Sequence, residues 1–249
     1  VLFRENVEGL YSGEGQVLLH NSEVTQDLNK ADRAEAKSVV TRKGCEQIIR
    51  AAYEYAINNK RKKVTIVHKS NILKTTSGLF LSVGKQIAEE YPQIETETMI
   101  ADAVAMKLVI NPKNFDVLVT TNFVGDVLSD LCAGLIGGLG LAPGANVGDD
   151  VYIAEAVHGT GPDIAGQNKA NPSALILACK MLLEKMGKHT EASVLEESLI
   201  KMYSLKNELT RDVGGQNGTK EFGEALCRTI KDSLKFKVHI NPKLNSTIK

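Results

Sequence analysis

The stretch Asn122-Phe-Val-Gly-Asp126-Val-Leu-Ser-Asp130-Leu-Cys-Ala-Gly134 decides the fold. The segment before it, Phe115-Asp-Val-Leu-Val-Thr-Thr121, is apolar and rich in β-branched residues, so it predicts a buried strand. The segment after it, Leu-Ile-Gly-Gly-Leu-Gly-Leu-Ala-Pro-Gly-Ala, predicts the end of a helix followed by a glycine- and proline-rich loop. A buried strand that runs directly into a helix is typical of α/β proteins.

Two carboxylates stand out in this stretch. Asp126 and Asp130 are four residues apart, so they lie on one face of the predicted helix. Like charges at this spacing repel each other, and a divalent cation with oxygen ligands would compensate. We expect both carboxylates to face a cleft, and Leu128, Leu131 and Leu135 to face the core. The alternative is that Asp126 caps the helix and Asp130 is solvated, since surface carboxylates are common.

The composition is that of an ordinary globular protein. The chain has 249 residues, of which 43% are hydrophobic and 24% charged, and its formal net charge is zero. This balance gives no reason to expect binding to nucleic acid or to a membrane surface, and no apolar run is long enough to span a bilayer. The cysteines are far apart in sequence and form no C-x-x-C pair, which argues against a zinc site or a disulfide framework.

The first residues have the character of the middle of a strand. Val-Leu-Phe-Arg begins the chain without a methionine, so we expect that an N-terminal part precedes Val1. A targeting peptide is therefore not excluded. The separated cysteines fit a reducing compartment. We expect the cytoplasm, with the mitochondrial matrix as the alternative.

Helices and strands alternate along the rest of the chain. Helices are predicted over 43–58, 77–90, 102–108, 190–205 and 220–236, together with one that Asn171 caps and Gly187 ends. Strands are predicted over 64–67 and 151–157, with shorter β-like pieces at 16–20 and 37–41 around a charged middle. The tail from Asn241 is polar, and we expect it to be frayed. The order predicts an α/β architecture in which helices cover a sheet.

Polar clusters sit where predicted elements end, which is where α/β folds place their sites. Arg4 follows the first strand and can bind a carboxylate through two parallel hydrogen bonds, and Tyr11 carries a phenol that can act as an acid. Lys69 directly follows a buried strand; partial desolvation would lower its pKa and suit it to base chemistry. Asp102 opens a helix. The alternatives are a surface ion pair for Arg4, packing for Tyr11, a lysine that extends to solvent, and a charge on the helix dipole for Asp102.

The last cluster is the loop Glu155-Ala-Val-His158-Gly-Thr-Gly-Pro-Asp163-Ile-Ala-Gly-Gln-Asn-Lys-Ala-Asn171-Pro172. Exposed backbone amides, a histidine and a helix N-terminus suit a nucleotide. The loop is not G-x-G-x-x-G after a strand, so an ordinary Rossmann site is not indicated.

Together these ordered clusters resemble the β-decarboxylating dehydrogenases, the family of isocitrate, 3-isopropylmalate and homoisocitrate dehydrogenases. The resemblance covers essentially the whole chain. It implies a two-domain α/β fold, a homodimer or larger assembly with shared active sites, and oxidation of a 2-hydroxy acid with NAD or NADP and Mg²⁺ or Mn²⁺. Residues 1–137 would form the smaller, dimer-forming domain with an interlocking excursion over 12–41, and residues 138–249 part of the cofactor domain.

The resemblance also implies roles for individual residues. Arg4 would bind a substrate carboxylate, Tyr11 would protonate the product enolate, and Lys69 would serve the deprotonation of the hydroxyl from a neighbouring subunit. The metal ligands would be Asp102, Asp126 and Asp130, one of them supplied across the dimer interface. The cofactor-binding residues would be Asn71, Glu155, His158, Gly159, Thr160, Gly161, Pro162, Asp163, Ile164, Asn171 and Asp212.

Within this family the sequence favours one substrate and one cofactor. The phrase Glu-Gly-Leu-Tyr-Ser-Gly, which begins at Glu8, is closer to isocitrate dehydrogenases than to isopropylmalate dehydrogenases; homoisocitrate dehydrogenases share much of the pattern. A non-catalytic regulatory subunit is the alternative of another class, although the tyrosine, the lysine and all three aspartates are present. Two features depart from the family: Val7 stands where Thr is frequent, and the family's first substrate-binding segment would lie before Val1. Asp163-Ile164 stands where NADP-dependent members carry Lys-Tyr, so we expect NAD.

Overall fold

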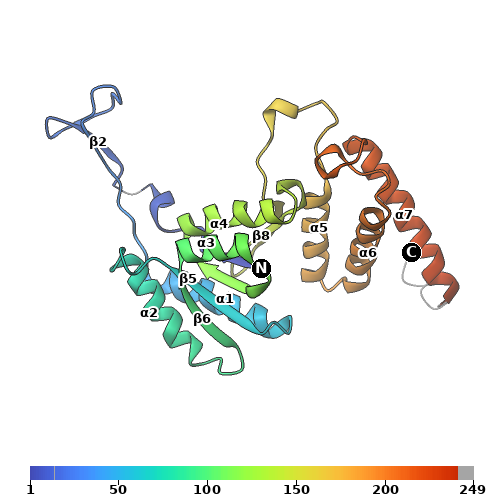
Figure 1. The fold of residues 1–249 in the computed structure, drawn as a ribbon, viewed down its shortest axis with the longest axis horizontal. Helices are drawn as coiled ribbons and strands as arrows, with labels where there is room; N and C mark the ends of the chain where they lie inside the picture. The colour runs from blue at the N-terminus through green and yellow to red at the C-terminus, as the bar shows by residue number, and fades with distance from the viewer. Residues whose placement is uncertain (14, 241–249) are drawn as a thin grey trace. The chain divides into compact units, whose positions relative to one another are not determined.

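The computed structural model describes residues 1–13 and 15–240, and the chain divides into two compact units, Val1–Cys132 and Ala133–Lys249. The prediction from sequence placed the domain boundary at 137/138. The first unit contains β1 (Leu2–Arg4), η1 (Leu10–Ser12), β2 (Val17–His20), β3 (Glu23–Thr25), β4 (Arg33–Glu35), α1 (Arg42–Asn58), β5 (Lys63–His68), α2 (Thr76–Ala88), β6 (Glu95–Ile100), α3 (Ala101–Ile110), η2 (Pro112–Asn114), β7 (Val117–Thr120) and most of α4 (Asn122–Leu135) (Figure 1).

A four-stranded parallel sheet forms the centre of the first unit, with strand order β1-β7-β5-β6. Side chains of β5 alternate between its two faces: Val64 and Ile66 pack under α1 and α2, and Val67 packs under α3 and α4. These three side chains are fully buried, and burying each contributes roughly 1.5–3 kcal/mol. Figure 1 shows the two helix pairs on opposite faces of the sheet, which confirms the predicted α/β architecture.

The predicted core face of α1 is confirmed, but that of α4 is only partly so. Cys45, Ile49, Ala52 and Ala56 are buried on α1, as expected, with Ile48 packed against them. On α4, Leu128 is buried and Leu131 is partly buried, whereas Leu135 is exposed. The prediction for Leu135 was wrong because that residue lies beyond Cys132, where the first unit and its core end.

The sequence analysis missed β6. Its residues Glu-Thr-Glu-Thr-Met-Ile are too polar to predict a buried strand. They form a strand because β6 is the edge of the sheet, where it pairs with β5 on one side only and remains half-exposed. Its threonines are β-branched, which favours extended backbone.

A separate antiparallel sheet, β3-β2-β4, fills the excursion predicted over 12–41. The predicted piece at 16–20 is β2, and the piece at 37–41 contributes only a bridge between Val39 and Gly9. The charged middle, which we did not predict as strand, contains β3 and β4. Asn21 and Ser22 turn the chain between β2 and β3 with positive φ, as a two-residue hairpin loop requires. Val24 and Leu28 are exposed, so this sheet has little core of its own.

The second unit is a hairpin followed by three helices. It contains η3 (Leu139–Leu141), β8 (Pro143–Val147), β9 (Tyr152–Ala156), η4 (Pro162–Ile164), α5 (Ser173–Lys185), α6 (His189–Leu205), η5 (Arg211–Val213) and α7 (Thr219–Ile240). The helix core is built around Leu199, Met202 and Phe222. We predicted β9 but read β8 as loop, because it begins Pro-Gly-Ala; proline is tolerated there as the first residue of a strand.

The predicted C-terminal end of α5 is confirmed, but the helix begins one residue later than predicted, with Pro172 rather than Asn171 at the N-cap position. Asn171 still contacts the first turn, because its Oδ1 accepts a hydrogen bond from the backbone N–H of Ser173. Gly187 has φ +74°, and its N–H and that of Lys188 bond back to the last turn. The predicted polar tail from Asn241 lies outside the described residues.

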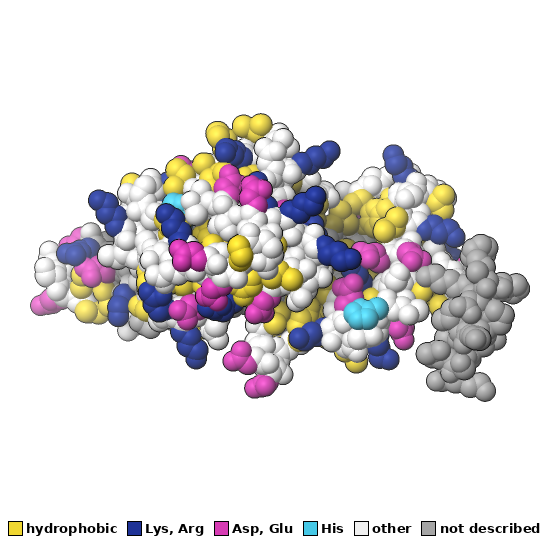
Figure 2. All heavy atoms as spheres, turned by 90° about the horizontal axis from the view of Figure 1, so that it is seen from below, with side chains coloured by type: hydrophobic (Ala, Val, Ile, Leu, Met, Phe, Trp, Pro, Cys, Tyr) yellow, Lys and Arg dark blue, Asp and Glu magenta, His cyan; other side chains and the backbone are white. Residues whose placement is uncertain are grey.

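The described surface carries charges of both signs. Figure 2 shows basic and acidic side chains interspersed over the face that it displays, in keeping with the formal net charge of zero. Within residues 1–13 and 15–240, no helix combines the length and the hydrophobicity needed to cross a bilayer. All cysteines are free thiols, as the sequence indicated.

Candidate active site

The parallel sheet brings the predicted catalytic residues of the first unit to one end, where its strands finish. Arg4 is the last residue of β1, and α4 begins at Asn122, directly after β7. Lys69 directly follows β5, and Asp102 lies in the first turn of α3, after β6. In parallel sheets of this kind, the carboxyl ends of the strands are where ligands bind.

Arg4, Tyr11 and Asp126 form one cluster at this end. Nη1 of Arg4 donates to Oδ1 of Asp126 at 2.5 Å, and the phenol of Tyr11 donates to the other carboxylate oxygen at 2.8 Å. The guanidinium also lies 5.5 Å from the centre of the Tyr11 ring. The hydrogen bond to Asp126 raises the pKa of Tyr11 above its ordinary value of 10.0, with a smaller opposing effect of Arg4. The phenol therefore keeps its proton at neutral pH, as a proton donor must.

Lys69 and Asp102 form a second cluster. Nζ of Lys69 lies 2.5 Å from Oδ1 of Asp102, and the lysine backbone is fixed by a hydrogen bond from its N–H to Oγ of Ser77. The hydrogen bond from Lys69 is the main cause that lowers the pKa of Asp102, and a backbone N–H at the start of α3 adds to it. We expected a partly desolvated lysine, and the side chain of Lys69 is 31% exposed and paired with a carboxylate.

The three aspartates predicted as metal ligands do not meet within this chain. Asp126 and Asp130 lie one turn apart on α4, while Asp102 is paired with Lys69 at the end of another strand. Among the described residues, no group of three His, Cys, Asp or Glu side chains is placed to hold a metal ion. The first unit therefore contains two separate clusters: an aspartate pair with Arg4 and Tyr11, and an aspartate with Lys69.

In the second unit the predicted cofactor loop is held at its C-terminal end. Nδ2 of Asn171 donates to Oδ2 of Asp212 at 2.9 Å, which brings together two residues predicted for the cofactor. Asn168 binds the N-terminal end of α7: its side chain donates to Glu221 and accepts from the backbone N–H of Lys220. Sequence reasoning missed Asn168, which has φ +53° and no motif of its own.

Other predicted residues of this loop are exposed. His158 donates from Nδ1 to the carbonyl of Gly159, and Asp163 and Ile164 lie in η4 with their side chains toward solvent. Glu155 accepts a hydrogen bond from Asn146 across the hairpin. Gly159, Thr160, Gly161 and Pro162 of this loop are exposed as well, and so are two predicted cofactor residues outside it, Asn71 and Asp212. Their surfaces are accessible to a ligand.

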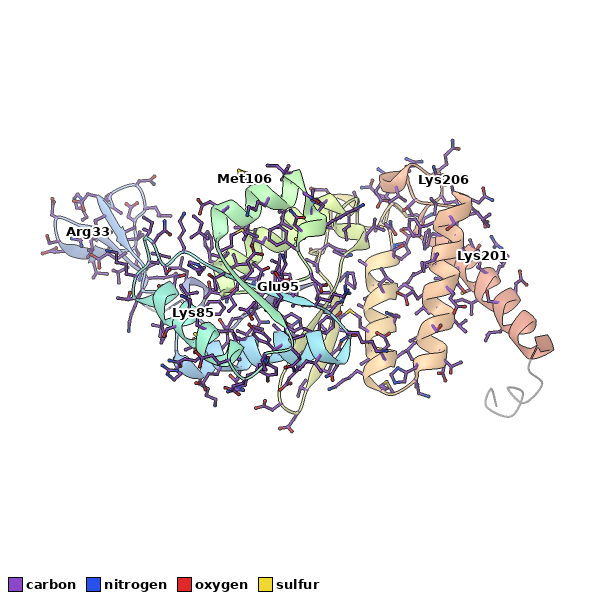
Figure 3. All side chains as sticks on the ribbon, turned by 60° about the horizontal axis from the view of Figure 1, so that its bottom comes forward. Arg33, Lys85, Glu95, Met106, Lys201 and Lys206 are labelled. Carbon is purple, nitrogen blue, oxygen red and sulfur yellow. The ribbon has the colours of Figure 1, made fainter. Side chains whose placement is uncertain are left out.

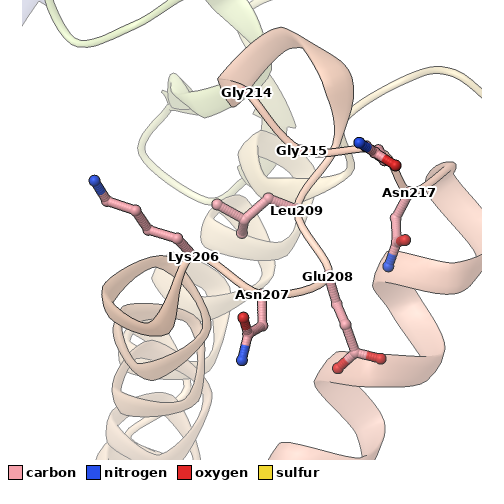
Figure 4. Close-up of a pocket in the computed structure, with 8 residues that line it drawn as sticks. Lys206, Asn207, Glu208, Leu209, Gly214, Gly215 and Asn217 are labelled. Carbon is pink, nitrogen blue, oxygen red and sulfur yellow. The ribbon is translucent and has the colours of Figure 1, made fainter.

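The two described cavities are elsewhere in the second unit. An open polar hollow of about 530 Å³ is lined by residues 206–209 and 214–217, on the loop between α6 and α7 (Figure 4). It flanks η5, which carries Asp212. A more apolar groove of about 460 Å³ runs along α5 and α6 beside Tyr203. Neither cavity includes Asp126 or Asp130, for which we had expected a cleft.

The arrangement of the first unit agrees with comparisons against known proteins. The sequence model of a family described as isocitrate/isopropylmalate dehydrogenase matches residues 1–226. This chain belongs to that family. The isocitrate/isopropylmalate dehydrogenase fold is confirmed by a crystal structure of isocitrate dehydrogenase from Methylococcus capsulatus, which is 48% identical with a TM-score of 0.86 and covers 92% of this chain and 66% of that one.

Curated relatives in the family are named for different functions. The chain is 45% identical over 235 residues to homoisocitrate dehydrogenase of Methanocaldococcus jannaschii, covering 94% of this chain and 64% of that protein. It is 42% identical to a mitochondrial protein of Dictyostelium discoideum that is named as a regulatory component of NAD isocitrate dehydrogenase, covering 94% of this chain and 63% of the relative. The chain therefore spans somewhat less than two thirds of the length of these relatives.

Proposed function

We propose that this chain is part of an NAD-dependent enzyme that converts isocitrate to 2-oxoglutarate by oxidative decarboxylation. The observation that carries the proposal is the Arg4–Asp126–Tyr11 cluster at the carboxyl ends of the strands. It combines a cation for a substrate carboxylate, a carboxylate suited to a divalent ion and a protonated phenol. Lys69, in the separate cluster with Asp102, would supply an amine to this site from a second copy of the chain.

Each residue of the site has its own step in the proposed reaction. Arg4 binds a substrate carboxylate, and Lys69 takes the proton of the hydroxyl as a hydride leaves the same carbon, so that a ketone forms. The carbon next to the ketone then loses its carboxylate: the C–C bond between them breaks, CO₂ leaves, and the electron pair remains on that carbon as part of an enolate. Tyr11 gives its proton to that carbon. When bound, NAD takes up the hydride, and a divalent cation acidifies the hydroxyl and stabilises the enolate charge.

We assign the divalent cation, Mg²⁺ or Mn²⁺, to Asp102, Asp126 and Asp130. Carboxylate oxygens are the ligands that these hard ions prefer, and waters and substrate would complete the shell. Asp126 and Asp130 share one face of α4, and the side chain of Asp126 is 46% exposed, so a ligand can reach it. The donor set therefore fits such an ion, with Asp102 supplied by a second copy of the chain.

An exposed apolar surface supports this second copy. On α3 it consists of Met106, Val109 and Ile110, which lie on the same helix face as Asp102; on α4 it consists of Phe123 and Val127, beside Asp130. Figure 3 shows Met106 on the side of α3 away from the sheet. Apolar surfaces of this kind mark protein interfaces. A homodimer joined here would bring Lys69 and Asp102 of one copy toward Asp126 and Asp130 of the other.

We further propose NAD over NADP and link Asp163 to that choice. An acidic side chain repels the 2′-phosphate of NADP and accepts hydrogen bonds from the ribose hydroxyls of NAD. Asp163 is exposed in η4, at the start of the predicted cofactor loop. Its exposure and its charge support the assignment.

Homoisocitrate is the second candidate substrate, because the Methanocaldococcus relative is named for it; 3-isopropylmalate is less favoured. A regulatory subunit is the candidate of another class, because the Dictyostelium relative is named as one. Turnover of the full-length protein with NAD and Mg²⁺ on each of the three acids tests these alternatives. A highest kcat/KM with isocitrate supports the proposal. Turnover with none of them, together with isocitrate binding, would favour the regulatory role.

A further inference from the structure

We propose that Asn122 and Gly125 are positioning residues that fix which edge of the Arg4 guanidinium meets the substrate, and that Asn122 also fixes the segment leading to Tyr11. The inference rests on the proposed function, because it assigns Arg4 to a substrate carboxylate. Neither residue touches the substrate in this account; both act through Arg4 or Tyr11.

Asn122 is a buried amide with a charged partner. Asn122 is only 2% exposed and is the first residue of α4. Oδ1 accepts two hydrogen bonds from Arg4, from Nε at 3.1 Å and from Nη2 at 2.7 Å. A cation offers donors only, so the oxygen of the amide must face the arginine and its nitrogen must face the other way.

The nitrogen of this amide holds a second element. Nδ2 of Asn122 donates to the backbone carbonyl of Glu8 at 3.0 Å. The Glu8 segment is fixed further by its own carboxylate, which accepts from the N–H and the hydroxyl of Thr41 at the start of α1, and by Gly9, which bonds to Val39. Tyr11 follows within η1. One buried amide thus connects the arginine to the segment that carries the phenol.

The contacts leave a defined part of Arg4 available. A guanidinium has five N–H donors. Three are used: Nε and one on Nη2 by Asn122, and one on Nη1 by Asp126. Among the described residues, one N–H therefore remains on each terminal nitrogen, so Nη1 and Nη2 are the part of the guanidinium that is left for a carboxylate. Asn122 occupies the edge of the guanidinium formed by Nε and Nη2, and so turns the edge formed by Nη1 and Nη2 toward a ligand.

Gly125 provides the space for the stem of Arg4. A Cβ added at Gly125 would lie 2.5 Å from Cγ and 2.8 Å from Cβ of Arg4. The Arg4 backbone cannot retreat freely, because it is paired with Thr120 in the sheet. An alanine at position 125 would therefore force the arginine side chain to rotate away from Asn122. The absence of a side chain here is thus required by the position of Arg4.

The test compares Asn122→Leu and Gly125→Ala with Gly223→Ala in the full-length protein. Gly223 lies inside α7, where an added Cβ meets no described atom within 4 Å, so it controls for the helix effect of the substitution. Two readouts are used: KM and kcat for isocitrate, and the ¹⁵N-arginine spectrum. Arg4→Lys assigns the Arg4 Nε–H signal, which should exchange slowly with solvent in the parent.

We expect Gly125→Ala to raise KM by about tenfold or more, since a hydrogen bond to a charged group is disturbed, while kcat changes by less than about twofold. Asn122→Leu should raise KM similarly and also lower kcat, because the Tyr11 segment is released. Both should abolish the slow exchange of Arg4 Nε–H, and Gly223→Ala should preserve it together with both kinetic constants.

Unchanged Arg4 Nε–H exchange in Gly125→Ala overturns the proposal, whatever the kinetics. Equal losses in kcat and KM with a lower Tm in Gly125→Ala also overturn it, because they indicate a structural role alone. If the parent turns over none of the three acids, the proposed function fails, and the exchange readout alone still decides the positioning of Arg4. If Asn122→Leu does not fold, Gly125→Ala decides.

Discussion

Replacing Asp126 with asparagine should separate the chemistry of the site from its stability. The substitution keeps the shape of the side chain and removes one negative charge. In the fold, Asp126 makes an ion pair with Arg4 and accepts one hydrogen bond from Tyr11, and its side chain is 46% exposed. Exposed ion pairs contribute at most about 1 kcal/mol, so the free energy of unfolding should fall by no more than about that amount.

Metal binding should respond far more strongly. Changing residues that merely support a metal ligand costs about 10–100-fold in affinity, and removing the charge of a ligand should cost at least the upper end of that range. We therefore expect the Kd for Mn²⁺, measured by calorimetry or by electron paramagnetic resonance, to rise by about 100-fold or more in Asp126→Asn. Turnover at fixed Mg²⁺ should fall steeply.

The matched control is Asp150→Asn, an exposed aspartate in the loop between β8 and β9, far in sequence from the proposed ligands. It should leave both Tm and the Kd for Mn²⁺ unchanged. Full activity and an unaltered Kd in Asp126→Asn would refute the metal assignment. A large fall in Tm would instead show that Asp126 serves the fold.

Other parts of the chain give three further predictions. Asp163→Lys combined with Ile164→Tyr should raise KM for NAD and lower KM for NADP; a parent that already uses both cofactors equally would contradict the assignment. The pKa of Asp102 is lowered below its ordinary value of 3.8 by its lysine partner, so its stabilising effect is present above that value and is lost as pH falls through the lowered pKa. The urea midpoint of Asp102→Asn should therefore lie below that of the parent at pH 6, and the difference should shrink as the pH is lowered. A Cβ on Gly84 would lie 2.8 Å from Cδ1 of the fully buried Ile66, so Gly84→Ala should lower the free energy of unfolding in urea by about 1–3 kcal/mol. Adding Ile66→Val removes that methyl group and should restore part of the loss. Additive losses in the double variant would refute the contact.

The buried parts of the fold were predictable from sequence because burial leaves a pattern. Continuous apolar residues identified β5 and β7, and the spacing of Ile49, Ala52 and Ala56 identified the inner face of α1. The edge strand β6 and the hairpin strand β8 left no such pattern. They are strands because a neighbour pairs with them, and pairing is set by the tertiary fold rather than by local composition.

The site, like the fold, could be predicted from sequence only in part. Arg4, Tyr11 and Asp126 were identified from their residue types and their family resemblance, but the hydrogen bonds to Asp126 join residues more than a hundred positions apart. No periodicity encodes such contacts. No role was predicted for Asn122, although a polar residue between a buried strand and a helix is a signal that could have identified it. Gly125 gave no signal, because the space that it leaves is visible only with Arg4 in place.

The pairing of β1 with β7 has a consequence for how the protein is made. The partner strand of β1 is synthesised about 115 residues after β1, which takes roughly 6–23 s at 5–20 residues per second. During that interval the apolar residues Leu2 and Phe3 lack the strand with which they pair in the described fold. Closing so long a loop is slow, which exposes the nascent chain to aggregation. The arginine end of the site is therefore assembled only when the sheet closes.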